Sequence, residues 1–181
     1  MVNFSELILR KFRNIAGSRY EEIMKAYQEF FLTEEELRIP VITSILLVVD
    51  RFSGRIPSEV FDVLSAYPGA RVDVVYLIDE GLFALIRDTL GEEEAEEFRK
   101  KEEAFGREIL KLAERALSEL GLDYSVEITF ADKVDFVETE SEERDLLVLS
   151  RHFGSESVKT HKVSPVVFRI VQGIKKPVIV Y

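Results

Sequence analysis

The residues best suited to binding chemistry directly follow two predicted buried strands and line the polar loop after the second strand. Asp50 follows the apolar segment 41–49, and Ser150 ends the segment DLLVLS at 145–150. The chain then runs through a basic loop to the helix-start signal Ser164-Pro165. A loop that leaves a buried strand and enters a helix N-terminus can hold an anion or a phosphate group. The candidate binding residues are Asp50, Ser150, Arg151, His152, Gly154 and Ser164.

The sequence leaves a second interpretation open for several of these residues. Asp50 either accepts hydrogen bonds from a ribose or a base, or caps its own loop through the backbone. His152 and His161 either contribute to an anion site or are exposed loop residues. A His152–Asp50 acid–base pair is a further option by position. However, the sequence lacks the H-x-G-H box that nucleotidyl-transferring α/β folds carry at a strand end. We therefore predict no catalytic residue and favour a protein that is not an enzyme.

Composition excludes several kinds of site and partner. The 181 residues include no cysteine, which excludes disulfides, Cys nucleophiles and thiolate metal sites. With only two histidines in the chain, we predict no metal site. The net charge of −10 argues against nucleic-acid binding, which needs a basic face. Residues 151–181, in contrast, hold six Lys and Arg residues and one acidic residue, a local patch that suits a small anion.

The same sequence gives two expectations about location. The longest apolar run, near 41–49, is too short to span a bilayer. The N-terminal residues MVNFSE lack the basic start and apolar stretch of a signal peptide. We therefore expect a cytoplasmic protein that does not bind a membrane.

Strands and helices alternate from residue 41 onward. Apolar and β-branched segments predict strands at 41–49, 71–79, 124–132, 145–150 and 176–181. Helical patterns lie between them, at 58–67, 80–91, 92–120, 134–143 and after Ser164. This alternation predicts an α/β domain over 41–181, with an open, Rossmann-like parallel sheet of five strands and right-handed crossovers.

Residues 1–40 have a different pattern. Apolar and aromatic residues recur there at helical spacing over 4–15 and 20–31, and Pro40 ends the segment. We predict an N-terminal helical extension over 1–40. Its aromatic face needs cover from the domain or from a protein partner.

The region 41–181 resembles the universal stress protein family. The resemblance is carried by the strand-ending VVD at 48–50, the DLLVLS strand, the Ser-led helix and the closing KKPVIVY. It implies the strand order 3-2-1-4-5 and a homodimer formed through the last strand. Tyr181 ends the chain on that strand, and an open apolar edge needs covering.

The ATP-binding motif of that family is altered in this chain. Members that bind ATP carry G-x-x-G-x9-G-[ST] after the fourth strand, where glycines let backbone N–H groups approach the phosphates. The three glycine positions fall on Ser150, Phe153 and Val163, and only Ser164 fits. Gly154 lies one place late, and Phe153 is expected to crowd the phosphate position.

The resemblance therefore implies a stress-related regulatory protein that is not an enzyme and has a degenerate nucleotide-binding crevice. No cofactor is required by the sequence, and an adenine nucleotide is the candidate ligand. The alternative is a module that binds AMP, ATP or another small phosphate through the basic loop 151–162. Its side chains would replace the lost glycine backbone, namely those of Arg151, His152, Lys159 and Lys162.

Overall fold

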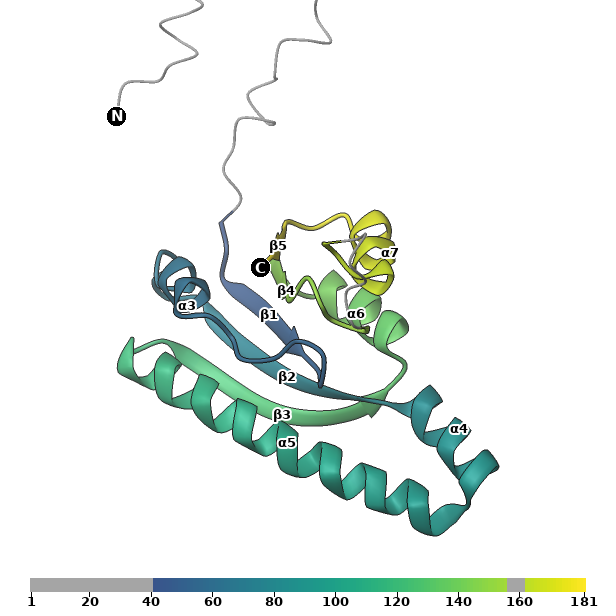
Figure 1. Ribbon diagram of the computed structural model, residues 1–181. Helices are drawn as coiled ribbons and strands as arrows, with labels where there is room; N and C mark the ends of the chain where they lie inside the picture. The colour runs from purple at the N-terminus through teal and green to yellow at the C-terminus, as the bar shows by residue number, and fades with distance from the viewer. Residues whose placement is uncertain (1–40, 156–161) are drawn as a thin grey trace, which may run out of the picture. The chain divides into compact units, whose positions relative to one another are not determined.

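The computed structural model describes residues 41–155 and 162–181, which form a parallel sheet with helices on both faces (Figure 1). The five strands lie in the order β3-β2-β1-β4-β5, and every neighbouring pair is parallel. The predicted fold class and the strand order implied by the family resemblance are both confirmed. The predicted helical extension over residues 1–40 lies outside the described residues.

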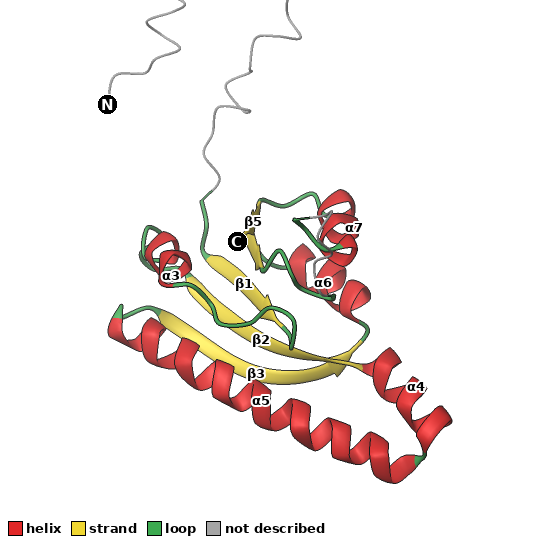
Figure 2. Cartoon of the chain, in the orientation of Figure 1, coloured by secondary structure: helices red, strands yellow, loops and turns green. Residues whose placement is uncertain are grey.

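Strands and helices alternate along the described chain (Figure 2). The strands are β1 Ser44–Val49, β2 Arg71–Asp79, β3 Asp123–Ala131, β4 Leu146–Leu149 and β5 Val178–Val180. The helices are α3 Ser58–Leu64, α4 Glu80–Leu90, α5 Glu92–Glu119, α6 Lys133–Glu142 and α7 Pro165–Gly173. β1 begins at Ser44, later than predicted, because its pairing with β2 begins at Ser44 opposite Arg71.

The sheet has a separate apolar core on each face, because side chains alternate along a strand. One core packs β-strand residues against α3 and α5 and includes Leu47, Val74, Phe61 and Leu117. The other packs the opposite strand residues against α6 and α7 and includes Val48, Leu147, Val137 and Ile170. The central strands are therefore buried on both faces, as their continuous apolar sequences predict.

Asp145 joins the beginnings of β4 and β1. One oxygen of its carboxylate accepts hydrogen bonds from the backbone N–H groups of Thr43 and Ser44, at 2.9 and 3.1 Å. The same oxygen accepts from both hydroxyl groups, at 2.8 and 3.1 Å. These bonds, led by the Thr43 N–H, lower the pKa of Asp145 from 3.8 to about 2.

We expect this site to contribute to acid sensitivity. A depressed folded-state pKa adds stability above the unfolded-state pKa, and that contribution is lost as the pH falls toward about 2. Asp145→Asn should therefore be less stable than the wild type at neutral pH, and the difference should shrink below pH 3.8. Urea unfolding at several pH values measures this. Asp62→Asn, at an exposed position on α3, is the matched control, and an Asp145→Asn difference that does not vary with pH would contradict the assignment.

Gly106 allows α5 to pack closely on the sheet. A Cβ atom at position 106 would lie 2.5 Å from Cδ1 of the Tyr76 ring. That ring is fully buried in the core, so an added methyl group would overpack it.

Gly106→Ala should therefore destabilise the protein, although alanine normally favours a helix by about 1 kcal/mol. Overpacking of this kind costs about 1–3 kcal/mol, measured by denaturant unfolding. Ser118→Ala, at an exposed position on the same helix, should be nearly neutral. A Gly106→Ala protein as stable as the wild type would show that α5 can shift to accept a methyl group.

Candidate functional site at the carboxyl ends of β1 and β4

The strand order reverses between β1 and β4, which are neighbours in the sheet although β1 is followed in sequence by β2. Asp50 directly follows β1 and Ser150 directly follows β4. Ligands of open parallel sheets bind in the crevice at such a reversal, outside the carboxyl ends of the strands. The structure thus brings the predicted residues Asp50 and Ser150 to the same edge.

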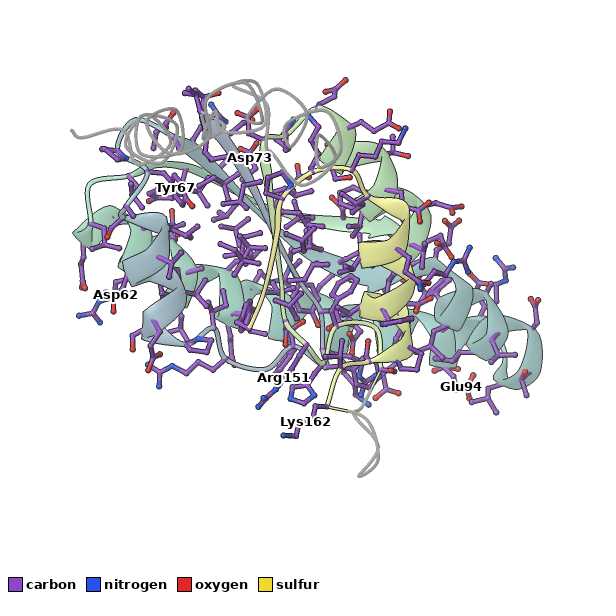
Figure 3. All side chains as sticks on the ribbon, turned by 90° about the horizontal axis from the view of Figure 1, so that it is seen from above. Asp62, Tyr67, Asp73, Glu94, Arg151 and Lys162 are labelled. Atoms are coloured by element: carbon purple, nitrogen blue, oxygen red, sulfur yellow. The ribbon has the colours of Figure 1, made fainter. Side chains whose placement is uncertain are left out.

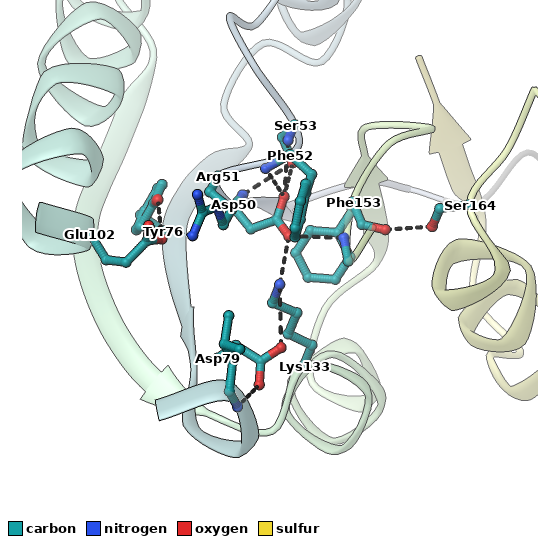
Figure 4. A network of polar contacts seen from close by, with 12 residues as sticks. Asp50, Arg51, Phe52, Ser53, Tyr76, Asp79, Glu102, Lys133, Phe153 and Ser164 are labelled. Atoms are coloured by element: carbon teal, nitrogen blue, oxygen red, sulfur yellow. Dashed lines mark hydrogen bonds and ion pairs between the residues drawn. The ribbon is translucent and has the colours of Figure 1, made fainter. Parts of the chain in front are cut away.

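The Asp50 carboxylate is fully buried, and other groups of the protein surround it (Figure 4). Its Oδ1 accepts from the backbone N–H groups of Phe52 and Ser53, at 3.1 and 2.9 Å, and from the Ser53 hydroxyl at 2.8 Å. Its Oδ2 accepts from Lys133 Nζ and from the Gly154 N–H, both at 2.8 Å. Asp50 therefore caps its own loop, the second interpretation that the sequence left open, and also binds two distant segments.

Lys133 is the residue of this site that the sequence analysis missed. Its ammonium group lies 2.8 Å from Asp50 Oδ2 and 3.5 Å from Asp79 Oδ2, and its side chain is 7% exposed. It also lies 5.1 Å from the centre of the Phe52 ring and 5.9 Å from that of Phe153. Figure 4 shows the ammonium between the two carboxylates.

One signal in the sequence could have indicated Lys133. It is the first residue of α6, and the N-terminus of a helix carries a partial positive charge that disfavours cations. A lysine at this position, directly after a predicted strand end, needs a compensating carboxylate. Asp50 and Asp79, both at strand ends, provide two.

Phe153 and Gly154 form the turn where the family motif has its second glycine. The Phe153 side chain is fully buried in the core against α6 and α7, and its ring centre lies 5.9 Å from Lys133 Nζ, so the ring fills space beside the Asp50–Lys133 pair. Gly154 has a φ of +84°, and a Cβ atom there would lie 2.5 Å from Cβ of Val166. The glycine therefore serves a tight turn against α7, and its N–H points at Asp50.

The two candidate serines use their hydroxyl groups within the protein. The Ser164 hydroxyl donates to the Phe153 carbonyl and accepts from the Val167 N–H, which makes it the predicted N-cap of α7. The Ser150 hydroxyl donates to the Ser53 carbonyl at 3.4 Å and accepts from the His152 N–H at 3.2 Å. Both residues are buried, so neither hydroxyl is free to meet a ligand without losing a bond.

Charged side chains of the basic loop lie at the surface of the same edge. Arg151 is exposed and its Nε donates to His152 Nε2 at 3.1 Å. Lys162 is also exposed, on the same side of the molecule as Arg151 in Figure 3. Lys159, the fourth residue of the predicted loop site, and the second loop histidine, His161, lie outside the described residues.

Two further groups border the crevice on the side of α5. Arg51 pairs with Glu102 at 3.2 Å, and Glu102 accepts from the Tyr76 hydroxyl at 3.1 Å. The hydroxyl of Tyr181 is buried and has no hydrogen-bond partner among the described residues. Burial, with a smaller contribution from the Asp50 charge, raises the pKa of Tyr181. This hydroxyl is an unsatisfied polar group close enough to Asp50 to feel its charge.

Two hollows lie away from these residues. One, of about 420 Å³, is at the beginnings of the strands and includes Arg71, Asp73 and Arg144 in its lining. The other, of about 790 Å³, runs between α3 and α5. In the first, Asp73 accepts from Arg71, Ser125 and Arg144, so its polar groups also pair with one another.

Solved structures share this architecture at low sequence identity. The universal stress protein UspA from Lactobacillus plantarum matches with a TM-score of 0.63 and 17% identity, over 78% of this chain and 99% of that chain. A universal stress protein family member from Burkholderia pseudomallei matches with a TM-score of 0.56 and 18% identity, over 80% and 98%. This chain has the universal stress protein fold. A universal stress protein in complex with cAMP matches with a TM-score of 0.50 and 14% identity, over 78% and 98%.

Sequence comparisons give no match. Neither a protein-family model nor a curated protein sequence matches the chain. None of the helices within 41–155 and 162–181 has the length and hydropathy of a membrane span. The assignment of the universal stress protein fold therefore rests on the arrangement of the strands and helices, not on sequence similarity.

Proposed function

We propose that this chain is a divergent universal stress protein with a regulatory, non-enzymatic role in the cytoplasm, and that its nucleotide crevice is degenerate. One observation carries the proposal: the polar groups at the strand reversal are bonded to one another. Asp50 accepts five hydrogen bonds from the protein, and Ser150 and Ser164 each make two. A similar fold binds cAMP in one solved universal stress protein, which makes adenine nucleotides the ligands to test.

A nucleotide phosphate would have to displace bonds that stabilise the fold. In the family motif, backbone N–H groups and the serine hydroxyl face the phosphates. Here the Gly154 N–H donates to Asp50, and the Ser164 hydroxyl donates to Phe153. Leaving a buried polar group unpaired costs about 1–3 kcal/mol, so tight phosphate binding at this turn is disfavoured.

The test is thermal unfolding of the full chain with ATP, ADP, AMP and cAMP at millimolar concentration. A ligand at 100 times its dissociation constant adds about 2.7 kcal/mol of stability, which raises the melting temperature by several degrees. We expect no such rise with any of the four nucleotides. A clear rise with one of them, or turnover of a nucleotide by the purified protein, would overturn the proposal.

A second candidate function uses the exposed basic side chains instead of the turn. Arg151 and Lys162 lie on the same side of the molecule and can reach a small phosphate from solvent. In this case AMP or inorganic phosphate stabilises the wild type, and the effect is lost in Arg151→Ala/Lys162→Ala. Lys175→Ala, at an exposed position beyond α7, is the control and should keep it. Stabilisation that survives the double substitution would exclude this site.

We also propose a homodimer formed through β5. Among the described residues β5 pairs only with β4, so its other edge is open. The exposed apolar residues Val180, Phe168 and Val171 lie on β5 and the adjoining α7. Sedimentation of the wild type should give a dimer, and Val180→Asp should give a monomer. Leu85→Asp, at an exposed apolar position on α4, should leave the dimer intact.

Residues 1–40 supply a separate proposal, a protein partner for their apolar face. Deleting residues 1–38 tests it. We expect the shortened chain to lose its binding to the protein partner or to change its oligomeric state. Unchanged oligomeric state and solubility would remove the basis of the proposal.

A further inference from the structure

We propose that Lys133 is an intramolecular ligand of the crevice, whose ammonium group occupies the position of a nucleoside's hydrogen-bond donors and thereby excludes nucleosides. The inference rests on the proposed function, because it takes the edge of β1 and β4 as a degenerate nucleotide site. The inference adds a specific cause for the proposed loss of nucleotide binding, namely the Lys133 side chain, which comes from a different part of the chain.

The surroundings of the Lys133 ammonium are those of a bound cationic ligand. Two carboxylates contact it, at 2.8 and 3.5 Å, and two aromatic rings lie with their centres 5.1 and 5.9 Å away. Carboxylate acceptors and aromatic faces together are how proteins recognise ammonium groups of ligands. Lys133 contributes this group from α6, 83 residues away from Asp50 in the sequence.

The local helix does not account for a lysine at this position. Asp132 already caps α6, accepting from the Val134 and Asp135 N–H groups at 2.9 and 3.0 Å. A cation at the first helical residue opposes the helix dipole. The position of Lys133 is therefore explained by the carboxylates of Asp50 and Asp79, not by α6.

Removing the Lys133 side chain would leave a site suited to a nucleoside. Asp50 Oδ2, which still accepts from the Gly154 N–H, and Asp79 Oδ2 would each gain room for an amino or hydroxyl donor. The rings of Phe52 and Phe153 would border the opened space. A purine nucleoside carries such donors on an aromatic base and a ribose, and bases pack well on aromatic side chains. The Gly154 N–H and Ser164 hydroxyl stay bonded within the protein, so a phosphate group adds little.

The experiment measures adenosine binding to the wild type, Lys133→Ala and Lys133→Met by calorimetry and thermal unfolding. We expect adenosine to bind Lys133→Ala at least about tenfold more tightly than the wild type. Lys133→Met should resemble the wild type in binding, because its side chain still fills the space. Lys175→Ala removes an exposed lysine beyond α7, away from the proposed binding residues, and should also resemble the wild type.

The outcomes separate this inference from the proposed function. Folded Lys133→Ala that binds adenosine no better than the wild type overturns the role of Lys133 and leaves the proposed function standing. Wild-type protein that binds ATP or AMP tightly overturns the proposed function itself. A gain in adenosine affinity that appears equally in Lys175→Ala would also overturn the inference, because the effect would not depend on Lys133.

A second variant covers the case in which Lys133→Ala does not fold. That substitution leaves two carboxylates near each other without a cation, a costly arrangement in a buried site. Asp50→Asn/Lys133→Ala removes one of the charges and keeps an oxygen acceptor at position 50. We expect it to bind adenosine more tightly than the single variant Asp50→Asn, in which Lys133 still fills the space. Equal affinity in these two proteins would overturn the inference.

Discussion

Asp50→Ala is expected to destabilise the protein by about 3–5 kcal/mol, the cost of breaking a buried ion pair by removing one partner. The substitution removes the closer of the two carboxylates that contact the buried Lys133 ammonium. It also leaves the Gly154 and Phe52 N–H groups without their acceptor, whereas the Ser53 N–H keeps the backbone carbonyl of residue 50. Urea unfolding of both proteins under identical conditions measures the loss.

Two matched variants give this result its meaning. Asp50→Asn keeps an oxygen acceptor and should lose less stability than Asp50→Ala. Asp88→Ala, at an exposed carboxylate on α4, should change stability by less than about 0.5 kcal/mol. If Asp50→Ala lost less than about 1 kcal/mol, water or another group would be replacing the carboxylate, and the crevice would be more open than its contacts indicate.

Phe153→Ala is expected to cost about 3–5 kcal/mol, since it removes a fully buried aromatic side chain from the core between α6, α7 and the sheet. Leu85→Ala, at a position that is 63% exposed on α4 and outside the proposed dimer face, should cost far less. Denaturant unfolding of the two variants measures both values. Similar losses at the two positions would contradict the assignment of Phe153 to the core.

Phe153→Gly tests whether the family motif can be restored at this position. It places a glycine where ATP-binding members have one, yet the Gly154 N–H and the Ser164 hydroxyl keep partners within the protein. We therefore expect Phe153→Gly to lose stability without gaining ATP affinity, measured by calorimetry. ATP binding by this variant would show that the Phe153 side chain alone closes the phosphate site.

The role of these residues follows from the number of segments that they join. Asp50 links the end of β1 to α6 through Lys133 and to the turn after β4 through Gly154. Ser164 links that turn to the beginning of α7. At this edge of the sheet, bonds within the protein therefore join the segments that follow β1 and β4 to α6 and α7.

The sequence by itself determined the features that depend on neighbouring residues. The apolar segments predicted the five strands, and the Ser164-Pro165 pair predicted the beginning of α7. Each of these signals acts within a few residues through backbone geometry or local hydrogen bonding. The loss of the glycine motif was likewise evident from the sequence, because Ser150, Phe153 and Val163 occupy its three glycine positions.

Only the tertiary structure decided which groups meet at the crevice. Lys133 and Gly154 contact Asp50 from 83 and 104 residues away, distances at which residue spacing carries no information about contact. The sequence also could not show that Phe153 turns into the core, because that depends on the space that α6 and α7 leave beside β4. The order of strands in the sheet brings these segments together, and Lys133 thereby reaches Asp50 Oδ2.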